Sequence, residues 1–362
     1  MSTFRVTAEK LTIHEHPNAD AIELAEVGLY RAVVPKGQYQ TGDWAIYIPE
    51  QAILPQELID ELGVTKFLAG RDHNRVVPMK LRGQLSQGIV CQPSTLADVD
   101  LVDAAAQDVD FASRLGITKW IPEVPLNMSG RVEPAANILS WIDIEDVKRF
   151  PGVLRPGEPV IATEKIHGVC CCVTVFSYGF AQVTSKGLGE QHLALAEDEN
   201  NLYWRAVREH QVIPVALSIL DNLDACKVAI FGEVFGAGVQ DLHYGLDHRD
   251  GRPGYRAFDI RVEDAYGHDR WLSQDEMVQQ LAAVPAVIET TPRVYEGPYD
   301  VDLLFDLAEH AERISGEARH MSEGLVVRPV VERRSDVLGG DQAIVKFKAP
   351  SYLTRKHGTE YQ

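Results

Sequence analysis

The sequence has no long hydrophobic run and no excess of positive charge. No apolar stretch approaches the roughly 20 residues that a membrane-spanning helix needs, and the first residues lack the pattern of a secretory signal. The chain carries 35 Lys and Arg against 53 Asp and Glu, a formal net charge of -18. We therefore expect a cytoplasmic protein without a membrane partner. Because a general polyanion binder needs many basic residues, we also expect its nucleic-acid contacts to be confined to a local basic surface.

Cysteines are few, and their spacing argues against a disulfide framework and against a zinc site. Three of the five are consecutive, Cys170 to Cys172. Adjacent cysteines cannot easily link distant parts of a fold, and they lack the paired C-x-x-C spacing of a zinc site. We interpret them as small apolar residues of a buried strand in a reducing compartment. The chain of 362 residues, 45% of them hydrophobic, is long enough for two domains.

Short alternating strand patterns separated by turn residues fill the first part of the chain. Examples are 22–27 and 44–48, with Gly, Pro, Asn and Asp between such runs. Many short strands favour a small β-barrel. The segment 16–21, His-Pro-Asn-Ala-Asp-Ala, resembles the opening of tRNA-binding OB-folds. We therefore predict an OB-like nucleic-acid-binding module over residues 1–115, with His14 and His16 at its surface.

Residues 66–82 are a local exception to the acidity of the chain. They contain five basic residues and one acid, Asp72, and the end of the segment alternates apolar and polar residues. A strand edge with basic side chains can follow a phosphate backbone, although the same pattern also fits a solvated basic face. The predicted RNA contacts are Lys66, Arg71, Arg75, Lys80 and Arg82.

The rest of the chain changes in character. Residues 116–158 are predicted to be a proline-interrupted connector with one short helix at 142–150. Beyond it, strand and helix patterns alternate, which indicates a second, mixed α/β domain over 159–362. We expect strands near 160–164, 169–176, 228–234, 256–262, 324–330 and 343–347. We expect helices near 201–223, 273–283 and 301–314, the second of them opened by a capping box at Ser273.

Lys165 lies on a short turn between two apolar runs. An amine attacks phosphorus only when it is unprotonated, and a free lysine, with a pKa of about 10.4, is almost wholly charged at neutral pH. Burial or neighbouring cations make a lysine a better nucleophile, and Gly168 lets the backbone approach a ligand closely. The pattern K-x-x-G also occurs at Lys80, so it is not specific by itself.

Four further motifs follow Lys165 in order, at 231–236, 257–260, 322–329 and 344–348. This ordered set resembles the covalent nucleotidyltransferase superfamily of ATP-dependent ligases and mRNA capping enzymes, and within it the RNA ligase 2 group. The N-terminal barrel and the segment 81–88 resemble the Deinococcus-type RNA ligases, which have an N-terminal OB module. The resemblance implies an α+β fold, with an OB-like barrel followed by a mixed α/β nucleotidyltransferase domain of the ATP-grasp-like ligase adenylation type.

The resemblance implies roles for the residues around the nucleophile. Lys165 would form lysyl-AMP, Glu164 would accept a hydrogen bond from the adenine amino group, and Gly168 would lie against the nucleotide. Lys186 occupies the place of an Arg or Lys that faces ribose and phosphate, although it also fits a solvated turn. We interpret His167 as a structural residue of the loop rather than as a base.

The resemblance also implies roles for the later motifs. Glu233 would hold a ribose hydroxyl, Phe258 would stack on the base, and Glu323 would face Mg²⁺ or Mn²⁺. Lys346 and Lys348, on one face of a strand, would neutralise the α-phosphate. The two glutamates also fit ordinary strand-end carboxylates and Phe258 a core residue. The loop 236–245 either touches substrate or is a plain connection.

The expected function is that of an ATP-dependent RNA ligase. It would join 3′-hydroxyl and 5′-phosphate ends through lysyl-AMP and an adenylylated 5′ end, as a monomer, at nicks in duplex RNA or in bridged RNA. About fourteen residues follow Lys348, too few for the further OB-fold of capping enzymes and most DNA ligases. The alternative is an RNA- or tRNA-binding protein with an inactive nucleotidyltransferase domain, against which the intact motif residues argue.

Overall fold

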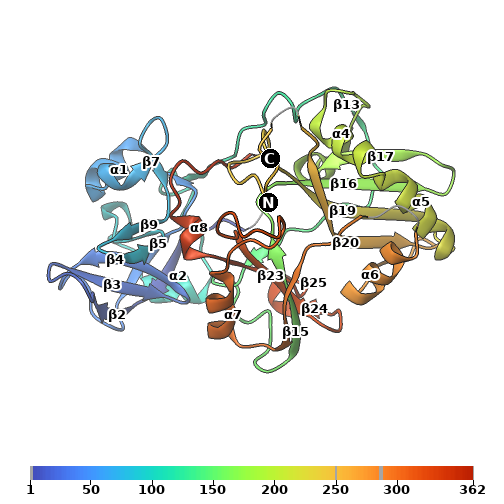
Figure 1. The fold of residues 1–362 in the computed structure, drawn as a ribbon. Helices are drawn as coiled ribbons and strands as arrows, with labels where there is room; N and C mark the ends of the chain where they lie inside the picture. Colours follow the sequence, from blue (N-terminus) through green and yellow to red (C-terminus); the bar gives the residue numbers. More distant parts are fainter. Residues whose placement is uncertain (1–2, 249–250, 285–287, 362) are drawn as a thin grey trace. The chain divides into compact units, whose positions relative to one another are not determined.

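The computed structural model describes residues 3–248, 251–284 and 288–361 (Figure 1). The chain divides into two compact units, one that ends at Ile121 and one that begins at Pro122. Residues 122–158, predicted to be part of a connector, therefore belong to the second unit. Among the described helices, none is long and apolar enough to span a membrane.

The first unit contains a small β-barrel, which confirms the predicted OB-like fold. Its strands form two three-stranded sheets, because alternating apolar residues turn one side of each strand inward. One sheet has the order β1 (Thr7–Lys10), β5 (Trp44–Ile48), β11 (Ile89–Cys91), and the other β2 (Thr12–Glu15), β3 (Ile22–Val27), β4 (Tyr30–Pro35). His14 is exposed as predicted, but the prediction for His16 was wrong. It is buried and bonds to the backbone of Asn18 and Leu81.

A smaller sheet, a hairpin and two helices complete the first unit. The sheet has the order β12 (Thr118–Lys119), β6 (Ala52–Ile53), β8 (Arg75–Val76), β7 (Leu68–Ala69). The hairpin joins β9 (Met79–Leu81) to β10 (Gln84–Ser86), and the helices are α1 (Gln56–Leu62) and α2 (Leu101–Ala106). One hydrophobic cluster joins Val6, Ile46 and Ile48 of the barrel region to Leu58 of α1 and Ala104 of α2.

Two sheets form the body of the second unit. The larger sheet has the order β13 (Val132–Pro134), β18 (Leu193–Leu195), β17 (Ala181–Ser185), β16 (Val169–Phe176), β19 (Lys227–Phe235), β20 (Gly254–Glu263), β21 (Asp269–Trp271). The smaller has the order β14 (Glu145–Asp146), β26 (Val345–Lys348), β23 (Gly324–Pro329), β15 (Pro159–Lys165), β22 (Arg293–Pro298). The strands that carry the predicted motifs are therefore β15, β16, β19, β20, β23 and β26.

Helices cover one side of the larger sheet. They are α3 (Lys186–Glu190), α4 (Leu202–Glu209), α5 (Val212–Asn222) and α6 (Gln274–Ala282), while α7 (Val301–Ala308) and α8 (Pro350–Leu353) accompany the smaller sheet. α5 packs on β16 and β19, and α6 packs on β20 (Figure 1). Cys171 faces this helical side, whereas Cys170 and Cys172 face the other, and all five cysteines are free thiols.

Three predicted helices differ in the structure. The helix expected at 142–150 is absent, because β14 pairs in parallel with β26 and Asp146 caps a turn. The helix expected at 201–223 is two helices, broken where Gln211 adopts a φ of 52°. The helix expected at 301–314 ends at Ala308, and Glu312 beyond it holds the backbone of Ser315 and Arg319. The capping box at Ser273 is confirmed.

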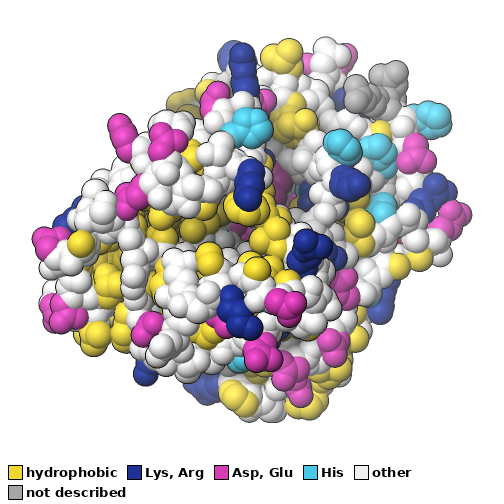
Figure 2. Space-filling model, turned by 90° about the vertical axis from the view of Figure 1, so that its left-hand side faces the viewer, with side chains coloured by type: hydrophobic (Ala, Val, Ile, Leu, Met, Phe, Trp, Pro, Cys, Tyr) yellow, Lys and Arg dark blue, Asp and Glu magenta, His cyan; other side chains and the backbone are white. Residues whose placement is uncertain are grey.

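Figure 2 shows one face of the molecule in space-filling form. Acidic and basic side chains are both scattered over this face, with hydrophobic side chains between them. In a chain with a net charge of -18, a basic side chain without an acidic neighbour is therefore informative about function.

Candidate active site

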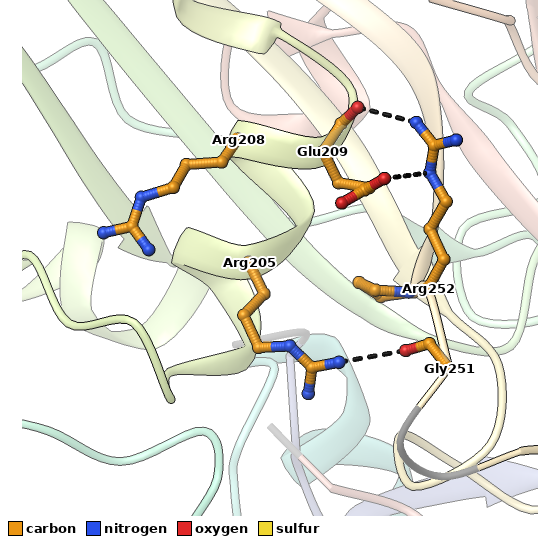
Figure 3. A pocket seen from close by; sticks show the side chains of 6 residues that line it. Arg205, Arg208, Glu209, Gly251 and Arg252 are labelled. Carbon is orange, nitrogen blue, oxygen red and sulfur yellow. Dashed lines mark hydrogen bonds and ion pairs between the residues drawn. The ribbon is translucent and has the colours of Figure 1, made fainter.

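A hollow of about 350 Å³ beside α4 is lined by three arginines, but their contacts are internal (Figure 3). Arg205 donates to the carbonyl of Gly251, and Arg252 pairs with Glu209 at 2.7 Å. Arg208 pairs with Glu197 outside the hollow. None of the predicted nucleotide-site residues lines it. We therefore interpret this group as one that fastens α4 to the segment before β20.

The predicted nucleophile lies beside a carboxylate at the end of β15. The antiparallel register pairs Lys165 with Gly324 of β23, so the preceding residue, Glu323, faces the amine. Lys165 Nζ lies 2.9 Å from Glu323 Oε1. Gly324 has a φ of 143°, and a Cβ there would lie 1.9 Å from the carbonyl oxygen of Phe347. Only glycine at position 324 therefore lets β23 lie this close to β26 where the two strands pair.

Gly168 brings the second glutamate to the same place. A Cβ on Gly168 would lie 2.2 Å from the carbonyl oxygen of Val234, so the tight approach of the loop to β19 requires glycine. Its amide donates to Glu233 Oε1 at 3.1 Å. The side chain of Glu233 is thereby held on the side of β19 that faces Lys165.

The two carboxylates have opposite pKa shifts. Burial, together with nearby Glu323, raises the pKa of Glu233 to about 8 against the lowering effects of Lys165, the Gly168 amide and Lys186. Burial also acts to raise the pKa of Glu323, but Lys165, His167 and Lys348 hold it below its ordinary value. Glu323 is therefore the ionised partner of Lys165, and Glu233 is neutral until further positive charge arrives.

The lysines of β26 belong to the same electrostatic group. Lys346 and Lys348 alternate along β26 and pair with Val326 and Gly324 of β23. Burial and repulsion by Lys348, Lys165 and Lys186 together lower the pKa of Lys346 to about 8, against the raising effect of Asp146. Several lysines thus crowd around one point, an arrangement that suits an anionic ligand.

Lys186 is held by an acid that we did not predict. It is the first residue of α3, which Ser185 caps, and its ammonium forms an ion pair with Asp143. Burial would raise the pKa of Asp143, but Lys186 lowers it below its usual range. Lys186 is therefore not a solvated turn residue. Asp143 lies in the segment wrongly predicted to be helical, which concealed its position.

Phe258 on β20 is half-buried against an aromatic cluster. Its ring meets the edge of Trp141 at 4.9 Å between centroids, and Trp141 also contacts Phe231 and Trp271. Phe258 is thus a core residue on one side and remains partly accessible on another. Trp141 had no signal in the sequence, because it lies in an irregular segment.

Glu164 is not part of the group around Lys165. Successive residues of a strand point to opposite faces, and Glu164 Oε2 accepts from the Arg313 amide at 2.9 Å. His310 Nε2 lies 3.7 Å from the same oxygen. The other oxygen, Oε1, is buried and has no hydrogen-bond partner among the described residues.

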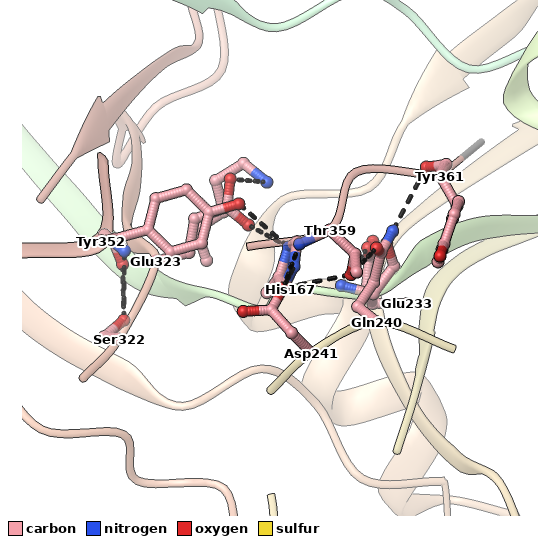
Figure 4. A network of polar contacts seen from close by, with 12 residues as sticks. His167, Glu233, Gln240, Asp241, Ser322, Glu323, Tyr352, Thr359 and Tyr361 are labelled. Atoms are coloured by element: carbon pink, nitrogen blue, oxygen red, sulfur yellow. Dashed lines mark hydrogen bonds and ion pairs between the residues drawn. The ribbon is translucent and has the colours of Figure 1, made fainter. Parts of the chain in front are cut away.

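His167 is fully engaged by a buried polar network (Figure 4). Its Nε2 contacts Asp241 Oδ1 at 2.8 Å, and its Nδ1 lies 3.0 Å from the hydroxyl of Tyr352. Its backbone amide donates to the hydroxyl of Tyr244. These contacts agree with a structural role for His167. They also show that the loop 236–245 braces the Lys165 turn.

The C-terminal segment completes this network (Figure 4). Arg355 Nε and the Thr359 amide both donate to Asp241, at 2.9 and 2.8 Å. Gln240 Nε2 donates to the carbonyls of Gly168 and Tyr361. Burial would raise the pKa of Asp241, but His167, Arg355 and Thr359 keep it well below its usual range. Tyr352, Arg355 and Thr359 were not predicted, because the sequence after Lys348 carries no motif.

The predicted RNA-binding residues all lie in the first unit. Lys66 precedes β7, Arg71 lies in the turn after β7, and Arg75 is on β8. Lys80 and Arg82 belong to the β9–β10 hairpin, where Arg82 adopts a φ of 49°. They therefore form two groups on the first unit rather than one continuous strand edge.

Comparisons with known proteins agree with this fold. The sequence profile of the RNA ligase family matches residues 158–348, and that of an OB-fold domain matches residues 5–93. A search of curated protein sequences finds no match.

Solved structures of the Naegleria gruberi RNA ligase are similar to this chain. A variant without ligand superposes with a TM-score of 0.75 at 22% identity, covering 98% of each chain. A variant with ATP and Mn gives 0.75 at 22% identity, over 96% of this chain and 98% of that one. The protein with PPi gives 0.74 at 21% identity, over 97% and 98%. Identity at this level establishes a common fold. Because the RNA ligase profile covers more than half of the 362 residues, the chain belongs to the RNA ligase family.

Proposed function

We propose that this protein is an ATP-dependent RNA ligase that joins a 3′-hydroxyl to a 5′-phosphate, with Lys165 as the carrier of AMP. The observation that carries the proposal is the 2.9 Å contact between the Lys165 amine and Glu323, beside the buried Glu233. A single exposed lysine would have no such surroundings. Lys346 and Lys348 on the neighbouring strand would offer positive charge to an α-phosphate beside this amine.

The reaction would proceed in two transfers of an adenylyl group and a final step that displaces AMP. The Lys165 amine attacks the α-phosphorus of ATP, so that a nitrogen–phosphorus bond forms, pyrophosphate leaves and the amine loses a proton. An oxygen of the RNA 5′-phosphate then attacks the same phosphorus, which frees Lys165 and forms a 5′–5′ diphosphate linkage. Finally the 3′-hydroxyl attacks the 5′-phosphate, loses its proton, and AMP leaves. Lys346 and Lys348 would stabilise the negative charge at each transfer.

Some of the groups that would hold the nucleotide still have a hydrogen-bonding atom or a ring face available for it. Glu164 Oε1, buried without a partner among the described residues, would accept from the adenine amino group. Phe258 would offer its accessible ring face to the base. Glu233 would hold a ribose hydroxyl, and Lys186 would face ribose and phosphate, positioned by Asp143. The Naegleria structure that contains ATP and Mn supports a nucleotide site in this fold.

Mg²⁺ or Mn²⁺ fits the residues present, with Glu323 as its side-chain contact. No group of three or more His, Cys, Asp or Glu that could hold a metal exists among the described residues. Mg²⁺ is usually held by one or two carboxylates together with substrate phosphates, and Glu323 and Glu233 provide such carboxylates. When bound, the ion would neutralise phosphate charge. Its arrival would also favour the ionised form of Glu233.

The RNA would be held in part by the first unit, through Lys66, Arg71, Arg75, Lys80 and Arg82. These residues offer cations for phosphate in an otherwise acidic chain. We propose that the substrate is a nick in duplex RNA or a bridged break, and that the protein acts as a monomer.

A sealing assay tests the proposal. With ATP and Mg²⁺, nicked RNA bearing a 5′-labelled phosphate is expected to give a longer strand and a transient adenylylated strand on a denaturing gel. Lys165→Ala should give neither, yet it should seal RNA whose 5′ end is already adenylylated. If the wild type sealed neither substrate, an inactive nucleotidyltransferase domain in an RNA-binding protein would be the better description.

A further inference from the structure

Besides Lys10 and Lys36, five basic side chains of the first unit, all between residues 66 and 82, have no acidic partner among the residues that the structure describes. They are Lys66, Arg71, Arg75, Lys80 and Arg82. In the same unit, Arg5, Arg31 and Arg114 each lie within 4 Å of a carboxylate. A chain with 53 acids has ample means to pair its cations. Cations that remain unpaired at one locality are therefore available for an external anion.

Arg75 is held by an aromatic ring instead of an acid. Its guanidinium lies 4.0 Å from the ring centroid of Trp120. Its Nε is buried and has no hydrogen-bond acceptor among the described residues. A planar guanidinium against an indole keeps its outer face and terminal N–H groups for another partner. The pair therefore forms a flat cationic platform.

The platform belongs to the outward face of the four-stranded sheet. Arg75 pairs with Ile53 and Ala69, and Thr118 pairs with Ile53, so these residues share one face. The opposite face, which carries Ala52, Leu68 and Val76, is buried in the core.

A second aromatic residue lies at the edge strand of the same sheet. Phe67 immediately precedes this strand and is 36% exposed, whereas the next residue, Leu68, is buried in the core. The Lys66 ammonium lies 4.9 Å from the Phe67 ring centroid. We name Lys66, Phe67, Arg71, Arg75 and Trp120 the Trp120 face. It combines two aromatic rings, each with its own cation.

We propose that the Trp120 face binds single-stranded RNA, with unpaired bases stacked on Phe67 and on the Arg75–Trp120 pair, and phosphates beside Lys66 and Arg71. This inference rests on the proposed RNA ligase function and specifies which RNA the first unit holds. Stacking on aromatic rings and guanidinium planes is how proteins hold unpaired bases, since every base has a π-face. Paired bases inside a duplex do not expose such faces. The first unit would therefore hold an unpaired strand next to the break, which favours the bridged break over the fully paired nick as the substrate.

The test measures the affinity of the full-length protein for a labelled oligouridylate of about 20 nucleotides by fluorescence anisotropy. Phe67→Ala and Trp120→Ala are each expected to weaken binding by about tenfold or more, the usual effect of losing one stacked base. Trp120→Phe should retain most of the affinity. Lys66→Gln and Arg71→Gln should each reduce the salt dependence of binding by about one ion.

Two exposed tyrosines provide matched controls. Tyr178 and Tyr266 are 74% and 87% exposed and lie in the second unit. Tyr178→Ala and Tyr266→Ala should leave the affinity unchanged. Thermal unfolding identifies any variant that fails to fold. If Trp120→Ala unfolds the first unit, Phe67→Ala and the Gln variants still decide the outcome.

Labelling of Lys165 by ATP separates this inference from the proposed function. All variants of the Trp120 face should form lysyl-AMP as the wild type does. Labelled, folded variants that bind oligouridylate as tightly as the wild type would overturn the inference and leave the function intact. Tighter binding of blunt duplex RNA, lost equally in Trp120→Ala, would also overturn it. A wild type that binds RNA but is never labelled would instead contradict the proposed function.

Discussion

Single residues in the candidate site differ in charge because their burial and neighbours differ. Glu323 is ionised by the lysines and His167 around it, whereas burial outweighs the nearby cations at Glu233 and raises its pKa. At Lys346, burial and the neighbouring lysines act in the same direction, and both lower its pKa. These groups reduce the stability of the empty site and prepare it for a phosphate and a cation.

Replacing Glu233 with Gln is expected to stabilise the fold at neutral pH while it impairs nucleotide transfer. The folded-state pKa, about 8, is above the ordinary 4.5, so the wild type has its full proton-linked stability below pH 4.5 and loses it as the pH rises through about 8. The amide of Gln stays neutral throughout. The difference in Tm between variant and wild type should therefore be near zero at pH 4 and grow up to pH 8.

Thermal unfolding from pH 4 to pH 9 measures that difference. The amide oxygen of the Glu233→Gln variant would still accept from the Gly168 amide, so the loop contact is kept. A constant difference across the range would contradict the assignment of a raised pKa to Glu233.

At the scale of elements, the Lys165 turn is held by two segments distant in sequence. The loop 236–245 provides Gln240, Asp241 and Tyr244, and the segment after α8 provides Arg355 and Thr359. The turn itself is short and carries the nucleophile. We therefore expect its position, and not the chemistry of the amine, to depend on these segments.

Asp241→Asn is expected to slow lysyl-AMP formation about tenfold or more, since it removes the charge that orders both His167 and Arg355. Asp241 is 18% exposed, so the loss of stability should be about 1–3 kcal/mol, smaller than for a fully buried pair. Single-turnover labelling with ATP gives the rate.

Asp264→Asn is the matched control for that variant. Asp264 caps the turn after β20 and lies opposite His268 on the surface. Its replacement should leave the labelling rate unchanged. If both variants slowed labelling equally, a general loss of stability would explain the effect, and the bracing role of Asp241 would be wrong.

Local patterns predicted the elements that carry the motifs, whereas long-range contacts escaped prediction. β15, β16 and β23 were predicted because each is an uninterrupted apolar run next to a glycine or a charged motif. Arg355 meets Asp241 across 114 positions of the chain, and no periodicity indicates such a contact. The wrongly predicted helix at 142–150 has the same cause, because the pairing of β14 with distant β26 overrides local preference. It also concealed the position of Asp143.

At the scale of the whole molecule, the two compact units have different roles in the proposed function. The nucleotide-site residues lie in the second unit, and the unpaired cations named above lie in the first. An acidic body with a local basic surface limits unproductive binding to other nucleic acids. Adenylylation and RNA holding should therefore be separable.

Deleting residues 1–121 is expected to leave measurable lysyl-AMP formation and to reduce severely the sealing of a bridged RNA break with unpaired bases beside it. The second unit keeps its own hydrophobic clusters, which contain no described residue of the first. Labelling and sealing are measured side by side on the same preparation. Sealing at the full-length rate by the truncated protein would show that the first unit does not hold the substrate.

The most direct test of the central claim is incubation with α-labelled ATP and Mg²⁺ or Mn²⁺, followed by a denaturing gel and mass spectrometry of the labelled peptide. The expected result is one AMP attached to Lys165, stable to denaturation, absent in Lys165→Ala and absent when the label is on the γ-phosphate. Folded wild-type protein that takes up no label from ATP, or that carries it on another residue, would contradict the claim.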